Sequence, residues 1–480
     1  MLFRNYKLTL TILIGVLVVN NISSCKKLVQ IPPPANSITT SQVFADSADA
    51  AAAISGIYAK IIGQTGDASC NGLETILCGL SSDELVSFNN GNTNQTQFYF
   101  NALESDNGIV PGCWTTPYTI IYQTNACIEG LQNSTSLTST TKNQFLGEAK
   151  FFRSLFYFYL INFFGNVPYV ASINWLQTDT LGNATPLFVY QNIINDLKSA
   201  KSLLPSDYSF SSGNRTRVNK LGAAALLARV YLYLQDWKNA KLESDSIINN
   251  NLFSLVDLDN VFLANSQESI LQWQLNTSYV YGTSTNEGVL ILPANQNSPP
   301  GYYLSSELLN AFDSSDGRKT AWLNQSKYAG VTYVYPYKYK RGRSQVNLNG
   351  TATEYYTVFR LAEQYLIRAE AEANGAGSST SAAISDLNII RKRADLPPLS
   401  PSLSGDSLMA AIAHERRIEL FAEWGHRWFD LRRTAKIDSI MTIITPKKNP
   451  GGVWQNYQQL YPIPLSQLSV NPFLKQNIGY

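Results

Sequence analysis

Acidic and basic side chains crowd into one short segment in the last fifth of the chain. They are Glu415, Arg416, Arg417, Glu419, Glu423, Arg427, Asp430, Arg432 and Arg433. Two carboxyl groups set roughly 5 to 9.5 Å apart across a cleft can hydrolyse a glycosidic bond when one of them stays protonated. Here each acid has an arginine three or four positions away or nearby in the segment, and a neighbouring guanidinium lowers the pKa of a carboxyl group. The pattern therefore favours an ion-pair network that locks the last helices together.

Other catalytic patterns are missing from the sequence. It contains no nucleophile elbow, phosphate loop, dinucleotide-binding glycine pattern or metal-spaced histidine set, and its only histidines are His414 and His426. Asp83 and Glu84 are adjacent, so they generally point to different faces, and we interpret them as a pair that orders a helix end or loop. We predict no catalytic residue, no cofactor and no metal.

The first 25 residues are typical of an exported lipoprotein. Arg4 and Lys7 flank a start that runs into the apolar stretch 8–20, which is too short to span a bilayer. Small residues then precede Cys25, a pattern that resembles a bacterial lipobox. We predict a signal peptide over residues 1–24, a lipid on Cys25 and a tether over residues 25–40. The alternative is an ordinary signal peptide, or a short membrane anchor, with an incidental cysteine.

Four further cysteines follow before residue 130: Cys70, Cys78, Cys113 and Cys127. One or two disulfides suit an oxidising compartment, and their pairing stays open; zinc is a weaker alternative because no close C-x-x-C pair exists. Removal of residues 1–24 leaves 35 basic and 35 acidic residues. This balance, without a Lys/Arg stripe, argues against a nucleic-acid partner.

Helical periodicity dominates the remainder and predicts a mainly α fold. Apolar residues recur near 3.6-residue spacing over 41–62, and residues 148–164 are apolar on almost every face, which predicts a buried helix. Residues 218–249 predict two helices in which alanines alternate with large side chains, similar to a tetratricopeptide repeat. Comparable pairs within about 148–250 and 355–394 predict a tetratricopeptide-like superhelix. Further helices are predicted over 355–373, 382–393 and 407–424.

Two regions depart from this pattern. Residues 267–355 are punctuated by Tyr, Asn, Gly and Pro, with short extended runs at 269–274 and 331–339. Long irregular regions in compact proteins tend to bind ligands. The tail, residues 446–480, must wrap over the helices or stay without fixed structure. We expect a single helical domain over residues 41–480 that includes this irregular loop-rich insert and the tail.

An ordered set of stretches along the chain resembles the SusD/RagB family of Bacteroidetes outer-membrane lipoproteins. The strongest are Glu415–Leu420 and Gly425–Arg433. The others are Cys25 with residues 26–28, Ser81–Leu85, Glu148–Pro168, Lys220–Trp237, Glu268–Ile270, Arg360–Ala371, Tyr461–Pro464, Asn471-Pro472 and Gln476–Tyr480. Because they span nearly all of the mature chain in order, the resemblance is highly specific.

The resemblance implies a helical body anchored by lipid in the outer membrane and exposed at the cell surface. It also implies a SusC-like TonB-dependent transporter as partner, on which the protein would dock as a lid. Such a protein captures an oligosaccharide or polysaccharide and releases it into the transporter without catalysis. Some family members handle peptides or other nutrients. A non-glycan nutrient, or a scaffold that holds proteins and no sugar, therefore stays open.

Side chains suited to a sugar gather in two loops. Aromatic faces contact the apolar side of pyranose rings, and amides pair with hydroxyl groups. The first loop, 88–107, is rich in Asn, Gln and aromatic residues; the second group is Tyr279, Tyr281, Tyr302, Tyr303, Trp322, Tyr328 and Tyr333. From their polar, irregular context we select as ligand-binding residues Phe98, Tyr99, Asn101, Tyr281, Tyr303 and Trp322. The alternative is that many of these aromatics fill the core or a transporter interface.

Overall fold

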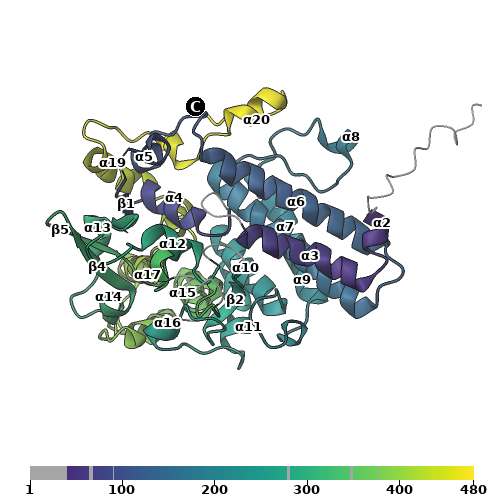
Figure 1. Cartoon of the computed structure of the whole chain (residues 1–480). Coiled ribbons are helices and arrows are strands. Elements are labelled where there is room, and N and C mark those ends of the chain that lie inside the picture. Colours follow the sequence, from purple (N-terminus) through teal and green to yellow (C-terminus); the bar gives the residue numbers. More distant parts are fainter. Residues whose placement is uncertain (1–39, 64–68, 90, 278–281, 346–349, 378) are drawn as a thin grey trace, which may run out of the picture.

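A computed structural model describes residues 40–63, 69–89, 91–277, 282–345, 350–377 and 379–480. Its body is a succession of helices, each packed on the one before it (Figure 1). The series begins with α6 (Val110–Asn133), α7 (Ser139–Phe164), α9 (Pro186–Leu203), α10 (Lys220–Tyr233) and α11 (Trp237–Ile248). It continues, across the long insert, with α15 (Leu361–Ala371), α16 (Thr380–Arg393) and α17 (Gly405–Glu419). The expected mainly helical architecture is confirmed.

The central helix of the body is α7. The side chain of Thr138 caps its first turn by accepting a 3.2 Å hydrogen bond from the Thr141 amide, and Gly165, at φ +70°, ends it. The helix starts nine residues before the predicted position, because its first turns are polar and carry no apolar period. Gly147 lies in this early part, where a Cβ atom would approach the Leu204 side chain to 2.6 Å. The glycine therefore permits close packing there.

The predicted helix pair at 218–249 is present as α10 and α11. Asn219 caps α10 by accepting hydrogen bonds from the Leu221 and Gly222 amides. Its alanines are buried and let neighbouring helices approach closely. Arg229, in the middle of this apolar helix, donates to both carboxylate oxygens of Glu363 on α15, at 2.7 and 2.8 Å. A buried ion pair thus joins two helices that are distant in sequence.

The predicted helix over 41–62 is two helices, α2 (Thr40–Val43) and α3 (Ser47–Ile62). Asp46 separates them, because its carboxylate accepts hydrogen bonds from the amides of Ala48 and Asp49 and so starts a new helix. Gly63 ends α3.

The insert contributes short antiparallel strand pairs. β1 (Leu85–Ser87) pairs with β3 (Tyr302–Leu304), β2 (Ser269–Trp273) with β6 (Tyr356–Arg360), and β4 (Leu323–Tyr328) with β5 (Val331–Pro336). The extended runs predicted at 269–274 and 331–339 are therefore confirmed as strands over 269–273 and 331–336. The helix predicted from residue 355 is wrong over its first residues, since 356–360 form β6. All five of these side chains are buried, so no alternation marked the strand in the sequence.

Shorter helices fill the spaces between these elements. They are α4 (Leu73–Ser81), α5 (Thr93–Tyr99), α8 (Trp175–Thr178), α12 (Asn286–Ile291), α13 (Ser306–Leu309), α14 (Gly317–Trp322), α18 (His426–Arg433), α19 (Ile437–Lys448) and α20 (Leu465–Val470). Single turns of other helical types are η2 (Ser209–Ser211), η3 (Leu258–Asn260), η4 (Arg343–Gln345), η5 (Glu372–Ala376) and η6 (Asn456–Gln459).

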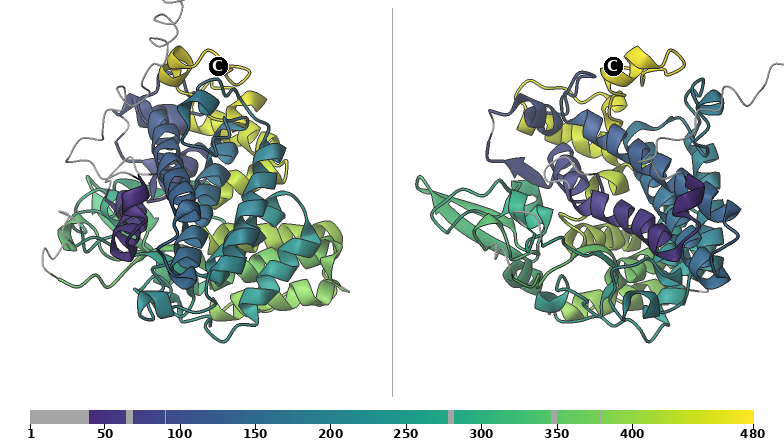
Figure 2. Two further views of the ribbon diagram at one scale, coloured as in Figure 1. Left: turned by 90° about the vertical axis from the view of Figure 1, so that its right-hand side faces the viewer. Right: turned by 45° about the vertical axis from the view of Figure 1, so that its right-hand side comes forward.

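The tail wraps over the helices instead of remaining without fixed structure. The amide of Tyr461 donates to the Phe163 carbonyl at 2.8 Å, and the side chain of Asn477 donates to the Phe164 carbonyl at 2.9 Å. The tail therefore closes the carboxyl end of α7. Figure 2 shows this last segment, in yellow, lying over the end of the helical body.

Candidate functional site

The two loops selected from the sequence meet in the structure. β1, which leads into residues 88–107, pairs with β3 so that Val86 lies opposite Tyr303 and Ser87 opposite Tyr302. The pairing extends one residue further, where the Phe88 amide donates to the Gly301 carbonyl at 3.0 Å. Segments more than 200 residues apart in the chain therefore form one surface.

Aromatic rings gather where these segments meet the β4–β5 hairpin. Phe88 contacts Tyr333 and Tyr328 edge-on, with ring centroids 5.5 and 5.8 Å apart, and Tyr303 lies 5.1 Å from Tyr333. Tyr99 lies on α5, and burial, together with the nearby Tyr303 hydroxyl, raises its pKa. Tyr328 is 43% exposed, and the other four rings are half-buried. We call these five residues the aromatic surface.

Backbone geometry explains how the hairpin contributes two rings. Its turn residues, Ala329 and Gly330, both have positive φ, which matches the right-handed twist of the flanking strands. Tyr328 pairs with Val331, and Tyr333 pairs with Ser326. Residues opposite one another, or two apart on one strand, share a face, so Tyr328 and Tyr333 lie on the same side of the hairpin. These two tyrosines and Phe88 were in the predicted loops but were not selected.

Three of the residues selected for ligand binding are buried, so they are not part of a binding surface. Phe98 and Trp322 are fully buried, and Asn101 is nearly so. Phe98 packs 5.2 Å from the ring of Tyr461, and the indole of Trp322 donates to the Leu258 carbonyl at 2.9 Å. These side chains fill the core, because tertiary packing overrides the polar context of their neighbours in sequence. Tyr99 and Tyr303 lie in the aromatic surface, and Tyr281 lies outside the described residues.

The amides of residues 88–107 mostly hold their own segment in shape. Asn101 donates to the Ser81 carbonyl at 2.9 Å, and Asn92 caps α5 by accepting from the Gln95 amide. Asn107 donates to the Asn94 carbonyl and to the Gln97 side chain. These amides therefore have structural partners, since the segment contains a helix whose caps and turns need them.

The predicted ion-pair network is confirmed and extends beyond the segment that suggested it. Arg318 donates to Glu415 at 2.6 Å and to Glu419 at 3.0 Å, and Arg360 donates to Glu419 at 2.6 Å and to Glu423 at 2.7 Å. Burial favours protonation of Glu419 and Glu423, but the surrounding arginines outweigh burial and lower the pKa of both. These acids stay ionised, so neither can act as a proton donor.

The adjacent acids before β1 have different environments. Arg427 and Arg417 donate to the Asp83 carboxylate at 2.7 to 2.9 Å. Burial opposes ionisation of Asp83, but these partners outweigh burial and lower its pKa. Burial, and then the charge of Asp83, raise the pKa of Glu84 to about 7. Asp83 thus fixes the segment that leads into the aromatic surface, in agreement with its interpretation as a loop-ordering residue.

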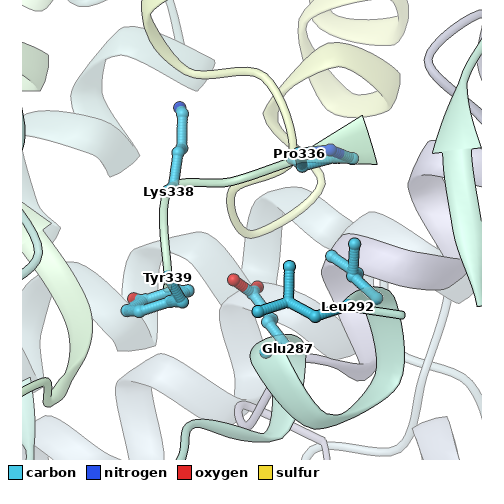
Figure 3. A pocket seen from close by; sticks show the side chains of 8 residues that line it. Glu287, Leu292, Pro336, Lys338 and Tyr339 are labelled. Carbon is cyan, nitrogen blue, oxygen red and sulfur yellow. The ribbon is translucent and has the colours of Figure 1, made fainter. Parts of the chain in front are cut away.

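Glu287, on α12, keeps its proton as a general acid would, but its carboxyl group is not accessible to a substrate. Burial raises its pKa to about 8, and the Tyr356 hydroxyl donates to it at 3.0 Å. Figure 3 shows its carboxyl group beside Leu292 and Tyr339, while the amine of Lys338 points away from it. The adjoining cavity measures about 10 Å³. This volume holds roughly one water molecule, so a sugar ring cannot reach the carboxyl group.

A larger hollow lies between α17, α18 and α19, with a volume of about 610 Å³. Its walls are aliphatic side chains such as Ile412 and Leu431 together with salt-bridged residues such as Arg427. No aromatic side chain lines it. The described part of the chain thus offers stacking faces for a ring-shaped ligand at the aromatic surface and not in this hollow.

Metal and membrane features can be judged for the residues that the structure describes. No group of three or more His, Cys, Asp and Glu side chains there is arranged to hold a metal ion, and no helix there is long and apolar enough to cross a bilayer. The cysteines left open by the sequence, at positions 70, 78, 113 and 127, are buried thiols that form no disulfide. Residues 1–39, with Cys25, lie outside the described residues.

Known proteins match this chain along most of its length. The family described as "SusD family" matches residues 319–480, and the one described as "Starch-binding associating with outer membrane" matches residues 40–232. SusD-like protein P2 of Formosa agariphila is 28% identical over 527 aligned residues, covering 99% of this chain and 100% of that protein. Starch-binding protein SusD of Bacteroides thetaiotaomicron is 26% identical over 411 aligned residues, which cover 69% of this chain and 72% of that protein.

Solved structures share the fold. A SusD superfamily protein from Parabacteroides distasonis matches with a TM-score of 0.75 at 23% identity, covering 92% of this chain and all of that one. A laminarin-binding SusD-like protein matches with a TM-score of 0.75 at 22% identity, and the match covers 90% of this chain and 99% of that one. Sequence and fold agree over both halves of the chain. The chain therefore belongs to the SusD family.

Proposed function

We propose that this protein is a cell-surface glycan-binding lipoprotein that holds an oligosaccharide against the aromatic surface. The observation that carries the proposal is the group of half-exposed rings contributed by Phe88, Tyr99, Tyr303, Tyr328 and Tyr333. Rings contributed from four separate segments can contact successive sugar units along their apolar faces. The starch-binding and laminarin-binding names of family members support a glycan as ligand class.

The protein binds its ligand without changing it. The carboxylates of the buried network are held ionised by arginines, which removes the protonated acid that glycoside hydrolysis needs. Glu287 keeps its proton but faces a cavity too small for a sugar. These features support binding and release in place of catalysis.

Family membership supports a delivery role for the chain. In this proposal Cys25 carries the lipid that anchors the chain in the outer membrane, and a SusC-like TonB-dependent transporter receives the ligand.

The test is a binding screen. Residues 26–480 are run through gels that contain plant, fungal or host polysaccharides, including starch and a laminarin-type β-glucan, and hits are titrated with oligosaccharides by calorimetry. We expect retardation by one polymer class and no products. Replacing Tyr303 or Tyr328 with alanine removes roughly 50 to 100 Å² of apolar contact, about 1 to 2.5 kcal/mol, so affinity should fall about five- to seventyfold.

A matched control separates loss of the ligand contact from general damage. Tyr122→Ala removes a ring that is 57% exposed on α6 and is not part of the aromatic surface, and it should leave affinity unchanged. If no polymer retards the wild-type chain, the glycan proposal fails and a peptide or other nutrient takes its place. Release of reducing sugar that disappears on mutation of an acid would instead establish an enzyme.

A further inference from the structure

The segments that form the aromatic surface carry almost no charge. Residues 85–103, which include Phe88 and Tyr99, contain no Asp, Glu, Lys or Arg, and neither do residues 288–306, which include Tyr303. Residues 320–337, which contain the β4–β5 hairpin, have a single charged side chain, Lys327. The whole chain has 15% charged residues, so these three segments are strongly depleted in charge.

The one charge in the hairpin lies on the face that the rings do not occupy. Lys327 pairs across the hairpin with Thr332, whereas Tyr328 pairs with Val331. Successive residues of a strand point to opposite faces of a sheet, so Lys327 lies on the face opposite Tyr328 and Tyr333. The ring-bearing face of the hairpin, over residues 323–336, therefore has no charged side chain.

Charged groups that approach from other elements already have partners. The Lys448 ammonium, at the end of α19, lies 5.1 Å from the centre of the Tyr99 ring, but it donates to the last two carbonyls of α4 at 2.6 and 3.0 Å. Glu307 on α13, also near Tyr99, accepts from Lys447 at 2.9 Å. The ammonium beside Tyr99 is therefore committed to the backbone and is not free to bind an anionic ligand.

Neutral hydrogen-bonding groups, in contrast, border the hairpin. The Lys327 amide donates to the Gln296 carbonyl at 2.8 Å, which places the loop at 294–297 beside β4. Asn295, Gln296 and Asn297 in this loop are exposed. A side-chain amide offers both donors and an acceptor, which complement the hydroxyl groups of a sugar.

From these observations we infer that the aromatic surface selects uncharged glycans and discriminates against acidic ones, such as uronic-acid or sulfated polymers. The inference rests on the proposed function, because it takes a glycan held at this surface as the ligand. Proteins bind carboxylates and other oxyanions strongly through Arg and Lys side chains, and a charged group that loses water without such a partner is costly. A neutral sugar meets rings and amides here and incurs no such cost.

The test compares polymers that share a backbone and differ in charge. The mature chain is run on affinity gels with starch or laminarin, with the carboxymethyl derivative of each, and with the hydroxyethyl derivative, which adds similar bulk without charge. Alginate, polygalacturonate and carrageenan serve as natural acidic polymers. We expect the carboxymethyl derivative to bind at least about tenfold more weakly than the hydroxyethyl derivative of the same polymer. Affinity for the neutral polymer should be the same in about 0.05 and 0.5 M NaCl, because no ion pair forms.

A lysine added to the ring-bearing face gives a sharper test. Val331→Lys places an ammonium next to Tyr328, at a position that is 51% exposed. Its matched control, Thr332→Lys, adds the same charge at an exposed position on the opposite face. Val331→Lys should strengthen binding of the carboxymethyl derivative, relative to the neutral polymer, about two- to fivefold at low salt. Thr332→Lys should leave that ratio unchanged.

Other results overturn the inference. If an acidic polymer binds as tightly as its neutral counterpart and Tyr303→Ala weakens both equally, the surface tolerates charge, although the proposed function stands. If the hydroxyethyl derivative binds as weakly as the carboxymethyl one, the surface discriminates by bulk and not by charge. An equal gain in Val331→Lys and Thr332→Lys would place the effect of charge outside the ring-bearing face. If no polymer, neutral or acidic, retards wild type, the proposed function itself fails.

Discussion

Arg360 is the residue whose loss should most disturb the buried ion-pair network. Its side chain is 2% exposed and makes five hydrogen bonds: two to the Glu423 carboxylate, one each to the Glu268 and Glu419 carboxylates, and one to the Glu419 carbonyl. In Arg360→Met, three acids remain buried with fewer partners. Breaking a buried pair by removing one member costs about 3 to 5 kcal/mol, because it leaves charge uncompensated. That is a large part of a typical folding free energy of about 5 to 15 kcal/mol.

Urea unfolding measured by circular dichroism tests this expectation. The midpoint should fall while the slope with denaturant stays the same, since the surface exposed on unfolding does not change. Lys447→Met is the matched control: it breaks the exposed pair with Glu307, 2.9 Å long, and should cost less than about 1 kcal/mol.

The pH dependence gives a second test of the same residue. The pKa of Glu423 is lowered in the folded chain, so the stability that its charge contributes is present above its unfolded pKa and is lost as pH falls through the folded value. Without Arg360 the folded pKa rises, so the acid midpoint of unfolding should move to higher pH. A variant whose stability lies within about 1 kcal/mol of wild type, with an unchanged acid midpoint, would refute the expectation that Arg360 stabilises the fold through this network.

Three further changes have expected outcomes. Glu287→Gln removes an acid whose folded pKa is raised to about 8. Wild type loses stability as pH rises from the unfolded pKa of this acid through 8, so thermal melting should show the variant more stable by on the order of 5 kcal/mol at pH 9 and similar at pH 4.5. Gly130→Ala places a Cβ atom 2.0 Å from the Phe44 ring and should cost about 1 to 3 kcal/mol despite better helix propensity; a higher melting temperature would contradict this packing. Lys338→Met removes the ammonium that donates to Glu423 and should weaken glycan binding about three- to tenfold, with faster amide exchange over residues 323–336; equal affinity by calorimetry would count against it.

Helical periodicity predicted the body of the fold because the helices are long and one-sided or fully apolar. The buried helix α7 and the pair α10–α11 could be identified from spacing alone. The strand β6 could not, because five consecutive buried residues carry neither a helical nor a strand period. Its partner β2 lies almost 90 residues earlier, and pairing over such a distance leaves no local signal in the sequence.

The candidate site was predictable at the level of segments and not of single rings. Both loops were identified from their composition, and the structure joins them at β1 and β3. Phe98 and Trp322 were selected from their polar neighbours in sequence, which do not reveal how a ring packs. Phe98 packs against Tyr461, and the ring of Trp322 lies next to the Lys338 ammonium. Tyr328 and Tyr333 had a usable signal: the Ala-Gly turn between two extended runs places both on one face of a hairpin.

The buried network and the aromatic surface are connected through the two ends of that hairpin. Helix α14 leads directly into β4, and its Arg318 is bound by Glu415 and Glu419. Two residues after β5, Lys338 donates to Glu423 and lies 4.1 Å from the Phe421 ring. A binding surface loses less conformational entropy when its side chains are held in place before the ligand arrives. The charges near the carboxyl end, which resemble a catalytic cluster in the sequence, thus hold both strands that carry Tyr328 and Tyr333. If these rings bind the ligand, as we propose, the charges should raise its affinity without touching it.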